Sequence, residues 1–125
     1  MDMKPAFHVI IAGSRSFSNV ELMKEKCDSI LSNKLDSHDI CIISGTAGGA
    51  DQCGERYAAE RGFKILRFPA NWSAYGRQSG MVRNAEMLQA ADAAIVFWDG
   101  ISRGSKHMID ITRLKNKPLR VILFK

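Results

Sequence analysis

Three short segments of the sequence combine glycine with small polar or charged side chains. They are Gly13-Ser14-Arg15, the run from Gly45 to Asp51, and the run from Asp99 to Ser105. Glycine lets a backbone approach a ligand closely, and the free N–H groups at a helix N-terminus favour an anion. The three segments therefore predict a site for a ligand that carries phosphate.

The second segment contributes most to this prediction. It consists of Gly45, Thr46, Ala47, Gly48, Gly49, Ala50 and Asp51. One glycine would suffice for a plain turn, so three favour a phosphate cradle. The spacing fits neither the G-x-x-x-x-G-K-[ST] loop nor the G-x-G-x-x-G fingerprint, which argues against a P-loop NTPase and an ordinary dinucleotide dehydrogenase. Asp51 has two interpretations, a favourable contact with the helix dipole or an acceptor for sugar hydroxyls.

The other two segments offer further polar groups. Arg15 is placed to grip a phosphate with two hydrogen bonds, unless it is a solvated surface side chain. Asp99 fits a general base or a ribose-binding carboxylate, but an aspartate before glycine is also a common turn former. Ser102, Gly104 and Ser105 lead into a helix that would bind a second phosphate, and Ser105 alone is a candidate N-cap.

Between the second and third segments lies a stretch with aromatic and basic residues. Trp72 is a candidate for stacking on a base or for anchoring its loop. Arg83 either points toward the site or pairs with Glu86 on the surface. No histidine cluster or cysteine pair is spaced as a metal site, so the sequence predicts neither a metal nor a resident cofactor.

Apolar runs that alternate with helical patterns must position these segments. Strands are predicted at 7–12, 39–44, 63–68, 93–98 and 119–124, and helices at about 18–31, 50–61, 79–91 and 106–116. A capping box, Ser18 to Glu21, starts the first helix, Gly62 ends the second, and 70–78 is a polar loop. Strict alternation predicts one α/β domain, residues 1–125, with a Rossmann-like three-layer sandwich and a five-stranded parallel sheet in the order 3-2-1-4-5.

The amino-acid composition indicates the class of protein and the compartment that suits it. The 125 residues are 46% hydrophobic and 25% charged, with a net charge of +5, which suits a globular domain with a modest attraction for phosphate. Three unpaired cysteines suit a reducing cytoplasm, and the short N-terminal apolar run predicts a strand rather than a signal peptide. No apolar stretch approaches the ~20 residues of a membrane span.

Several motifs, in order along nearly the whole chain, resemble the YspA/cpYpsA-related branch of the SLOG superfamily. That superfamily joins the DprA/Smf DNA-processing proteins to the Lonely Guy (LOG) phosphoribohydrolases. The motifs are IAGSRSF (11–17), SGTAGGAD (44–51), FPANW (68–72), YGRQSGMVRNAEML (75–88) and FWDGISRGSKHMI (97–109). The resemblance implies a Rossmann-like domain that binds nucleotides or their derivatives, and related domains often pair as homodimers.

The resemblance also implies site residues. Gly13, Ser14 and Arg15 match the first loop of the family, and Ser102, Gly104 and Ser105 match its last. Gly45, Ala47, Gly49, Ala50 and Asp51 match the second loop. Arg83-Asn84-Ala85-Glu86-Met87 is similar to the R-K-x-x-M motif of the enzymes, with Asn84 in place of lysine, so Arg83 and Asn84 are expected to face the ligand. Met108 stands where the catalytic glutamate would be.

Three functions follow as hypotheses. The first is a receptor for a nucleotide or nucleotide derivative. The second is a hydrolase that cleaves the N-glycosidic bond of a nucleotide, with Arg83 holding phosphate and Asp99 stabilising positive charge on the ribose. The third, less favoured, is single-stranded DNA binding, because no stripe of alternating aromatic and basic residues is visible.

Overall fold

The computed structural model describes residues 3–125, so residues 1 and 2 of the predicted domain lie outside the described part. Five strands form a parallel sheet in the order β3-β2-β1-β4-β5, which confirms the predicted class and strand order. The strands are β1 (Ala6–Gly13), β2 (Asp39–Ser44), β3 (Lys64–Arg67), β4 (Ala93–Trp98) and β5 (Leu119–Leu123).

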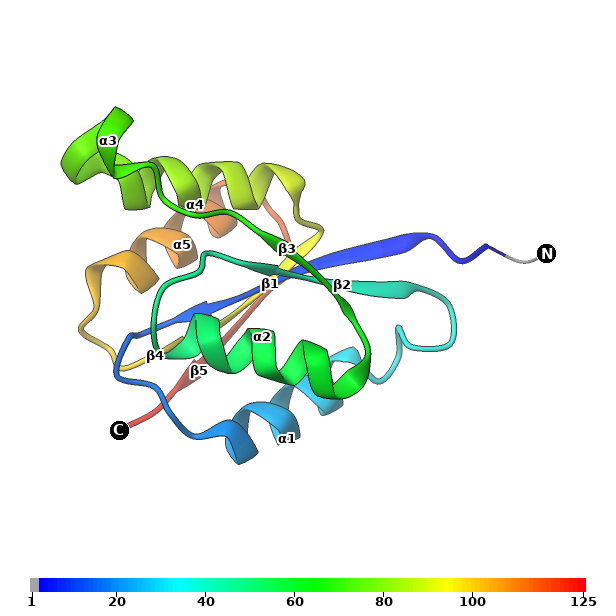
Figure 1. Cartoon of the computed structure of the whole chain (residues 1–125). Coiled ribbons are helices and arrows are strands. Elements are labelled where there is room, and N and C mark those ends of the chain that lie inside the picture. The colour runs from blue at the N-terminus through cyan, green and yellow to red at the C-terminus, as the bar shows by residue number, and fades with distance from the viewer. Residues whose placement is uncertain (1–2) are drawn as a thin grey trace.

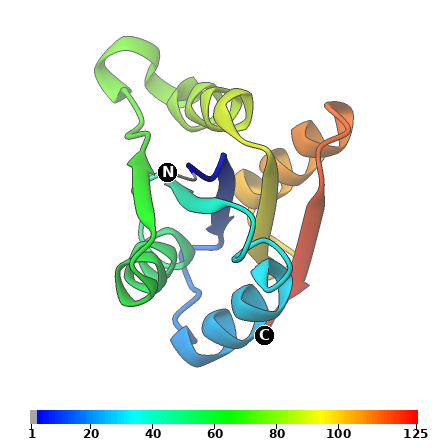
Figure 2. The same ribbon diagram turned by 90° about the vertical axis from the view of Figure 1, so that its right-hand side faces the viewer.

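Helices cover both faces of the sheet (Figures 1 and 2). One face carries α1 (Val20–Leu31) and α2 (Ala50–Arg61), and the other carries α4 (Ser79–Ala90) and α5 (Arg103–Leu114). The short helix α3 (Trp72–Tyr75) and a 3-10 turn, η1 (Gly76–Gln78), lead into α4. None of the helices in residues 3–125 is long and apolar enough to cross a membrane.

The continuous apolar run of β1 explains why both layers are needed. Val9 and Ile11 pack in the core beneath α1 and α2, whereas Ile10 and Ala12 pack in the core beneath α4 and α5. Successive side chains of a strand point to opposite faces, so a central strand that is covered twice must be apolar throughout. β1 is therefore packed on both faces, and the loop that follows it lies at the edge of the sheet.

The small residues of α2 bring this helix close to β1, as their pattern predicts. A side-chain carbon added to Gly54 would lie 2.8 Å from Cγ2 of Ile11, so only glycine permits this approach. The helix ends at Gly62, which has the left-handed conformation (φ 72°) expected of a C-terminal glycine.

Two helix starts differ from the sequence-based expectation. The N-cap of α1 is Asn19, whose Oδ1 accepts from Leu22 N at 3.0 Å, so the capping box predicted at Ser18 is wrong by one residue. Asn and Ser cap about equally well, and the local sequence does not decide between them. α5 begins at Arg103 rather than near residue 106, so Ser105 lies in its first turn and is not its N-cap.

The loop predicted at 70–78 contains α3 and η1 instead of irregular chain. Oδ1 of Asn71 accepts from Ala74 N at 3.1 Å and caps this short helix. Four residues carry too little periodicity for a helix to be recognised in the sequence.

Candidate functional site

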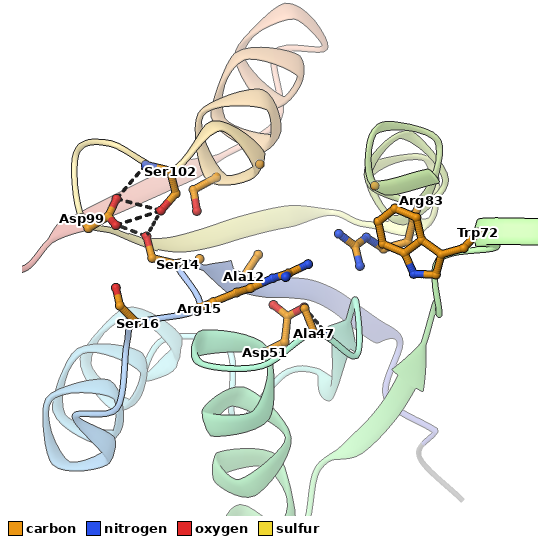
Figure 3. Close-up of a pocket in the computed structure, with 14 residues that line it drawn as sticks. Ala12, Ser14, Arg15, Ser16, Ala47, Asp51, Trp72, Arg83, Asp99 and Ser102 are labelled. Carbon is orange, nitrogen blue, oxygen red and sulfur yellow. Dashed lines mark hydrogen bonds between the residues drawn. The ribbon is translucent and has the colours of Figure 1, made fainter. Parts of the chain in front are cut away.

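A cavity of about 490 Å³ opens at the carboxyl ends of β1, β2 and β4 (Figure 3). This is the edge of the sheet, beside the reversal of strand order between β1 and β4, at which open parallel sheets bind ligands. Most of the site residues predicted from the sequence line the cavity: Gly13, Ser14, Arg15, Ala47, Asp51, Trp72, Arg83, Asp99, Ser102, Gly104 and Ser105. Ala12, Ser16 and Gly80 line it too, although sequence reasoning did not select them.

The loop after β4 is organised by the carboxylate of Asp99. Its Oδ1 accepts from the backbone N–H groups of Ser102 (2.8 Å) and Ile101 (2.9 Å), and the Ser102 hydroxyl also bonds to the carboxylate. These bonds, led by the one from Ser102 N, lower the pKa of Asp99 to about 2. Asp99 N in turn donates to Ser14 Oγ at 3.0 Å, which ties this loop to the one after β1 (Figure 3). The carboxylate thus stays ionised and shapes its own loop.

The N-terminus of α5 leaves several donors around the cavity. The first backbone bond of the helix runs from Lys106 N to Ser102 O (3.2 Å), so the N–H groups of residues 103–105 precede the hydrogen-bonded turns. Ser105 is only 5% exposed, and its Oγ is the one buried side-chain polar atom without a hydrogen-bond partner among residues 3–125. A side-chain carbon on Gly104 would meet no atom within 4 Å. Open space, free donors and an unsatisfied hydroxyl are features of an anion site.

In the first two loops, glycine is needed at two positions for a reason other than open space for a ligand. A side-chain carbon on Gly13 would overlap the carbonyl group of Phe97, and one on Gly49 would overlap the backbone of Arg15. Gly49 also has φ +70°, which favours glycine. Gly48 has open space around it. Close packing of neighbouring loops therefore accounts for glycine at 13 and 49 without a ligand.

The remaining predicted residues lie around the main cavity rather than on it. Gly45 and Thr46 line a smaller cavity of about 140 Å³, which shares Arg15, Ala47, Trp72 and Arg83 with the main one. Four predicted residues line neither cavity: Gly48, Gly49, Ala50 and Asn84.

Asp51 contributes a buried carboxylate to the wall of the main cavity. It is 5% exposed, lies in the first turn of α2, and its Oδ2 accepts from Ala47 N at 3.0 Å. Burial raises the pKa of Asp51 to about 6, although the bond from Ala47 and the positive charge of Arg83 act in the opposite direction.

Arg83 reaches into the site from α4. Its Nη1 donates to Gly45 O at 2.8 Å and its Nε to Asn84 Oδ1 at 3.3 Å, and burial lowers its pKa. Asn84 is buried, and its Nδ2 lies 3.3 Å from Gly104 O and 3.1 Å from Nδ1 of His107. Arg83 therefore lines the cavity, whereas Asn84 does not line it and connects Arg83 to the start of α5.

Two other features bear on the sequence-based expectations. Trp72 is 58% exposed and lies beside the Arg83 end of the cavity (Figure 3). Met108, at the position of the enzymes' glutamate, is buried in the core between α4, α5 and the sheet and does not line the cavity. Within residues 3–125 no three His, Cys, Asp or Glu side chains gather as metal ligands would.

Solved structures share the fold. DNA processing protein A (DprA) from Streptococcus pneumoniae matches 98% of this chain with a TM-score of 0.72 at 17% sequence identity, and the chain spans 51% of the DprA chain. The protein TM1055 matches 94% of this chain with a TM-score of 0.61 at 18% identity, over 72% of its own length. At these identities the likeness concerns the fold.

Sequence comparison adds a closer relation. The Gene 61 protein of Mycobacterium phage D29 is 30% identical over 105 residues, which span 79% of this chain and 82% of the phage protein. The family model described as "YspA, cpYpsA-related SLOG family" matches residues 7–75. The chain therefore belongs to the YspA, cpYpsA-related SLOG family.

Proposed function

We propose that the chain, acting as one domain over residues 1–125, is a receptor for a nucleotide or nucleotide-derived ligand that binds in the main cavity. The observation that carries the proposal is the buried, unpartnered Ser105 hydroxyl beside the free N–H groups at the start of α5. A phosphate group would accept hydrogen bonds from these donors and interact favourably with the helix dipole. The guanidinium groups of Arg15 and Arg83 add positive charge to the same cavity.

The other residues of the site supply the remaining contacts of a nucleotide. Ser14 and Ser102 hold the loops in place, and Trp72 offers an aromatic face at the end of the cavity near Arg83. The fold of DprA and the family membership agree with a nucleotide-related role.

A thermal-shift screen tests the proposal. The probes are nucleoside mono-, di- and triphosphates, cyclic nucleotides, ADP-ribose and sugar phosphates. A ligand at 100 times its dissociation constant adds roughly 2.7 kcal/mol to the stability, which is several degrees for a domain of this size. Ser105→Ala and Arg83→Ala should each weaken the shift, because each removes a hydrogen-bond donor from a residue that lines the cavity. Arg113→Ala, at an exposed position near the end of α5, is the matched control. No shift with any probe would refute the proposal.

The hydrolase hypothesis is separated from binding by product analysis. Release of free base from a bound nucleotide would favour N-glycosidic hydrolysis, with loss in Asp99→Asn as the expected signature. Stable binding without release would favour the receptor. The position of Met108 in the core supports the receptor, since the glutamate of the LOG motif has no counterpart in the cavity.

DNA binding and pairing of two copies are tested separately. Single-stranded DNA binding predicts an affinity that falls steeply with salt, which a titration with a labelled oligonucleotide would detect. Pairing of two copies is tested by light scattering with and without the ligand found in the screen.

A further inference from the structure

The Asp51 carboxylate has acceptor capacity that the protein does not use. Among residues 3–125, the only hydrogen bond to its oxygens is the one from Ala47 N to Oδ2. None of the ion pairs within residues 3–125 includes it. An ionised carboxylate accepts at two oxygens with about four lone-pair positions, and leaving them unpaired in a buried setting is costly. A donor supplied by the ligand would satisfy them.

The charged groups that face Asp51 come from three elements. Arg15 faces it from the loop after β1, Arg83 from α4, and Glu55 from the next turn of α2. Glu55 is itself occupied, because it accepts from Ser44 Oγ (2.7 Å) and Arg67 Nε (2.9 Å). The carboxylate of Asp51 is therefore the free acceptor of this group, and the two arginines are donors.

Donors and acceptors in a cavity select different parts of a nucleotide. Phosphate oxygens accept only, so they match the arginines and the N–H groups of α5 and are repelled by a carboxylate. The hydroxyls of a sugar donate, and they match a carboxylate. Asp51 lies between the cluster of Ser14, Asp99 and Ser102 and the end of the cavity that holds Trp72 (Figure 3). A sugar at Asp51 would thus lie between the N–H groups at the start of α5 on one side and Trp72 with Arg83 on the other.

We propose that Asp51 determines the sugar specificity of this site, by accepting hydrogen bonds from the 2′- and 3′-hydroxyls of a ribonucleotide. The inference rests on the proposed nucleotide-binding function. A 2′-deoxyribonucleotide lacks one donor and leaves part of the buried carboxylate unpaired. Sites built to bond a hydroxyl reject the analogue that lacks it. Since hydrogen bonds to charged groups are among the stronger ones, the ribonucleotide should bind about 10- to 100-fold more tightly.

The experiment compares matched ligand pairs by calorimetry. AMP and dAMP, ADP and dADP, and GMP and dGMP are titrated into the wild-type protein and into Asp51→Asn. The wild type should prefer the ribonucleotide by about 10- to 100-fold, and the variant should reduce this preference to about threefold or less. Asp36→Asn makes the same chemical change at an exposed turn residue away from the cavity and should keep the preference.

A second measurement needs no variant. The ratio of the two affinities in the wild type should fall as pH decreases from 8 to 5, because protonation of Asp51 turns an acceptor-only group into a partial donor. The phosphates of each pair titrate alike and cancel in the ratio.

The outcomes separate the two proposals. Equal affinity of ribo- and deoxyribonucleotides for the wild type, or a preference that survives in Asp51→Asn, would overturn the role of Asp51 and leave nucleotide binding intact. Failure of both members of every pair to bind would overturn this inference, and silence across the wider ligand screen would overturn the proposed function itself.

Discussion

Removing the charge of Asp51 should make the protein more stable at neutral pH. The carboxyl is buried, and its pKa is raised from 3.8 to about 6 in the folded chain. The folded state therefore binds its proton more tightly than the unfolded state does. The contribution of the protonated Asp51 carboxyl to the free energy of unfolding is fully present below about pH 4. It is lost as the pH rises through about 6. The difference between a pKa of 3.8 and one of about 6 corresponds to about 3 kcal/mol.

Asp51→Asn keeps the shape and the acceptor for Ala47 N but cannot ionise. At pH 8 the variant should be more stable than the wild type by up to about 3 kcal/mol, or roughly 10 °C in Tm for a chain of this length. At pH 4 the difference should shrink to well under 1 kcal/mol, because Asp51 is then protonated in the folded state. Urea unfolding of both proteins at half-unit steps from pH 4 to pH 8 measures the difference curve, in which the other carboxylates cancel.

Asp36→Asn is again the control, and its difference from the wild type should not follow the same course. A variant that is less stable at pH 8, or a difference that does not change between pH 4 and pH 8, would refute the reasoning. Either result would mean that Arg83 and Arg15 compensate the buried charge fully. A positive result would instead mark Asp51 as a residue whose charge costs stability, as is common at functional sites.

Three further predictions concern single residues. Gly49→Ala should destabilise the fold by about 2 kcal/mol or more, because its φ is +70° and its new carbon would overlap the backbone of Arg15, whereas Gly48→Ala, which has open space around it, should cost clearly less in urea unfolding. Cys27 should be inert to a disulfide reagent at pH 8 until the protein unfolds, since burial raises its pKa to about 12, and rapid labelling of the native protein would contradict this. Ser105→Ala should leave the stability unchanged or raise it by up to about 1 kcal/mol, because its hydroxyl has no partner to lose; destabilisation in thermal unfolding would show that it does.

The periodicity of the sequence was enough to predict the architecture. Apolar runs such as Val9 to Ala12 predict strands that are buried on both faces, and their alternation with helical patterns leaves few arrangements. The strand order followed, and with it the edge of the sheet at which the loops meet. The site was predicted to this extent because loops that follow parallel strands necessarily lie on one edge.

Glycines illustrate what the same patterns could not separate. The run from Gly45 to Gly49 predicted a phosphate cradle, but in the structure Gly49 is required by the backbone of Arg15 and only Gly104, in another loop, borders open space within the cavity. A ligand that approaches the backbone closely and a neighbouring loop that does so both require a residue without a side chain. Sequence reasoning cannot distinguish them, because the neighbouring loop comes from a distant part of the chain.

The sequence by itself determined the parallel sheet, its order and the three loops that surround the cavity, because these depend on local periodicity and on chain connectivity. The tertiary structure alone decided how the polar groups divide their roles. It engaged Asp99 in its own loop, connected Asn84 with Arg83 and the start of α5, and left Asp51 and Ser105 with unused hydrogen-bonding capacity. Burial and hydrogen-bond partners come from residues far apart in the chain, and they determine which of two chemically similar side chains remains available to a ligand.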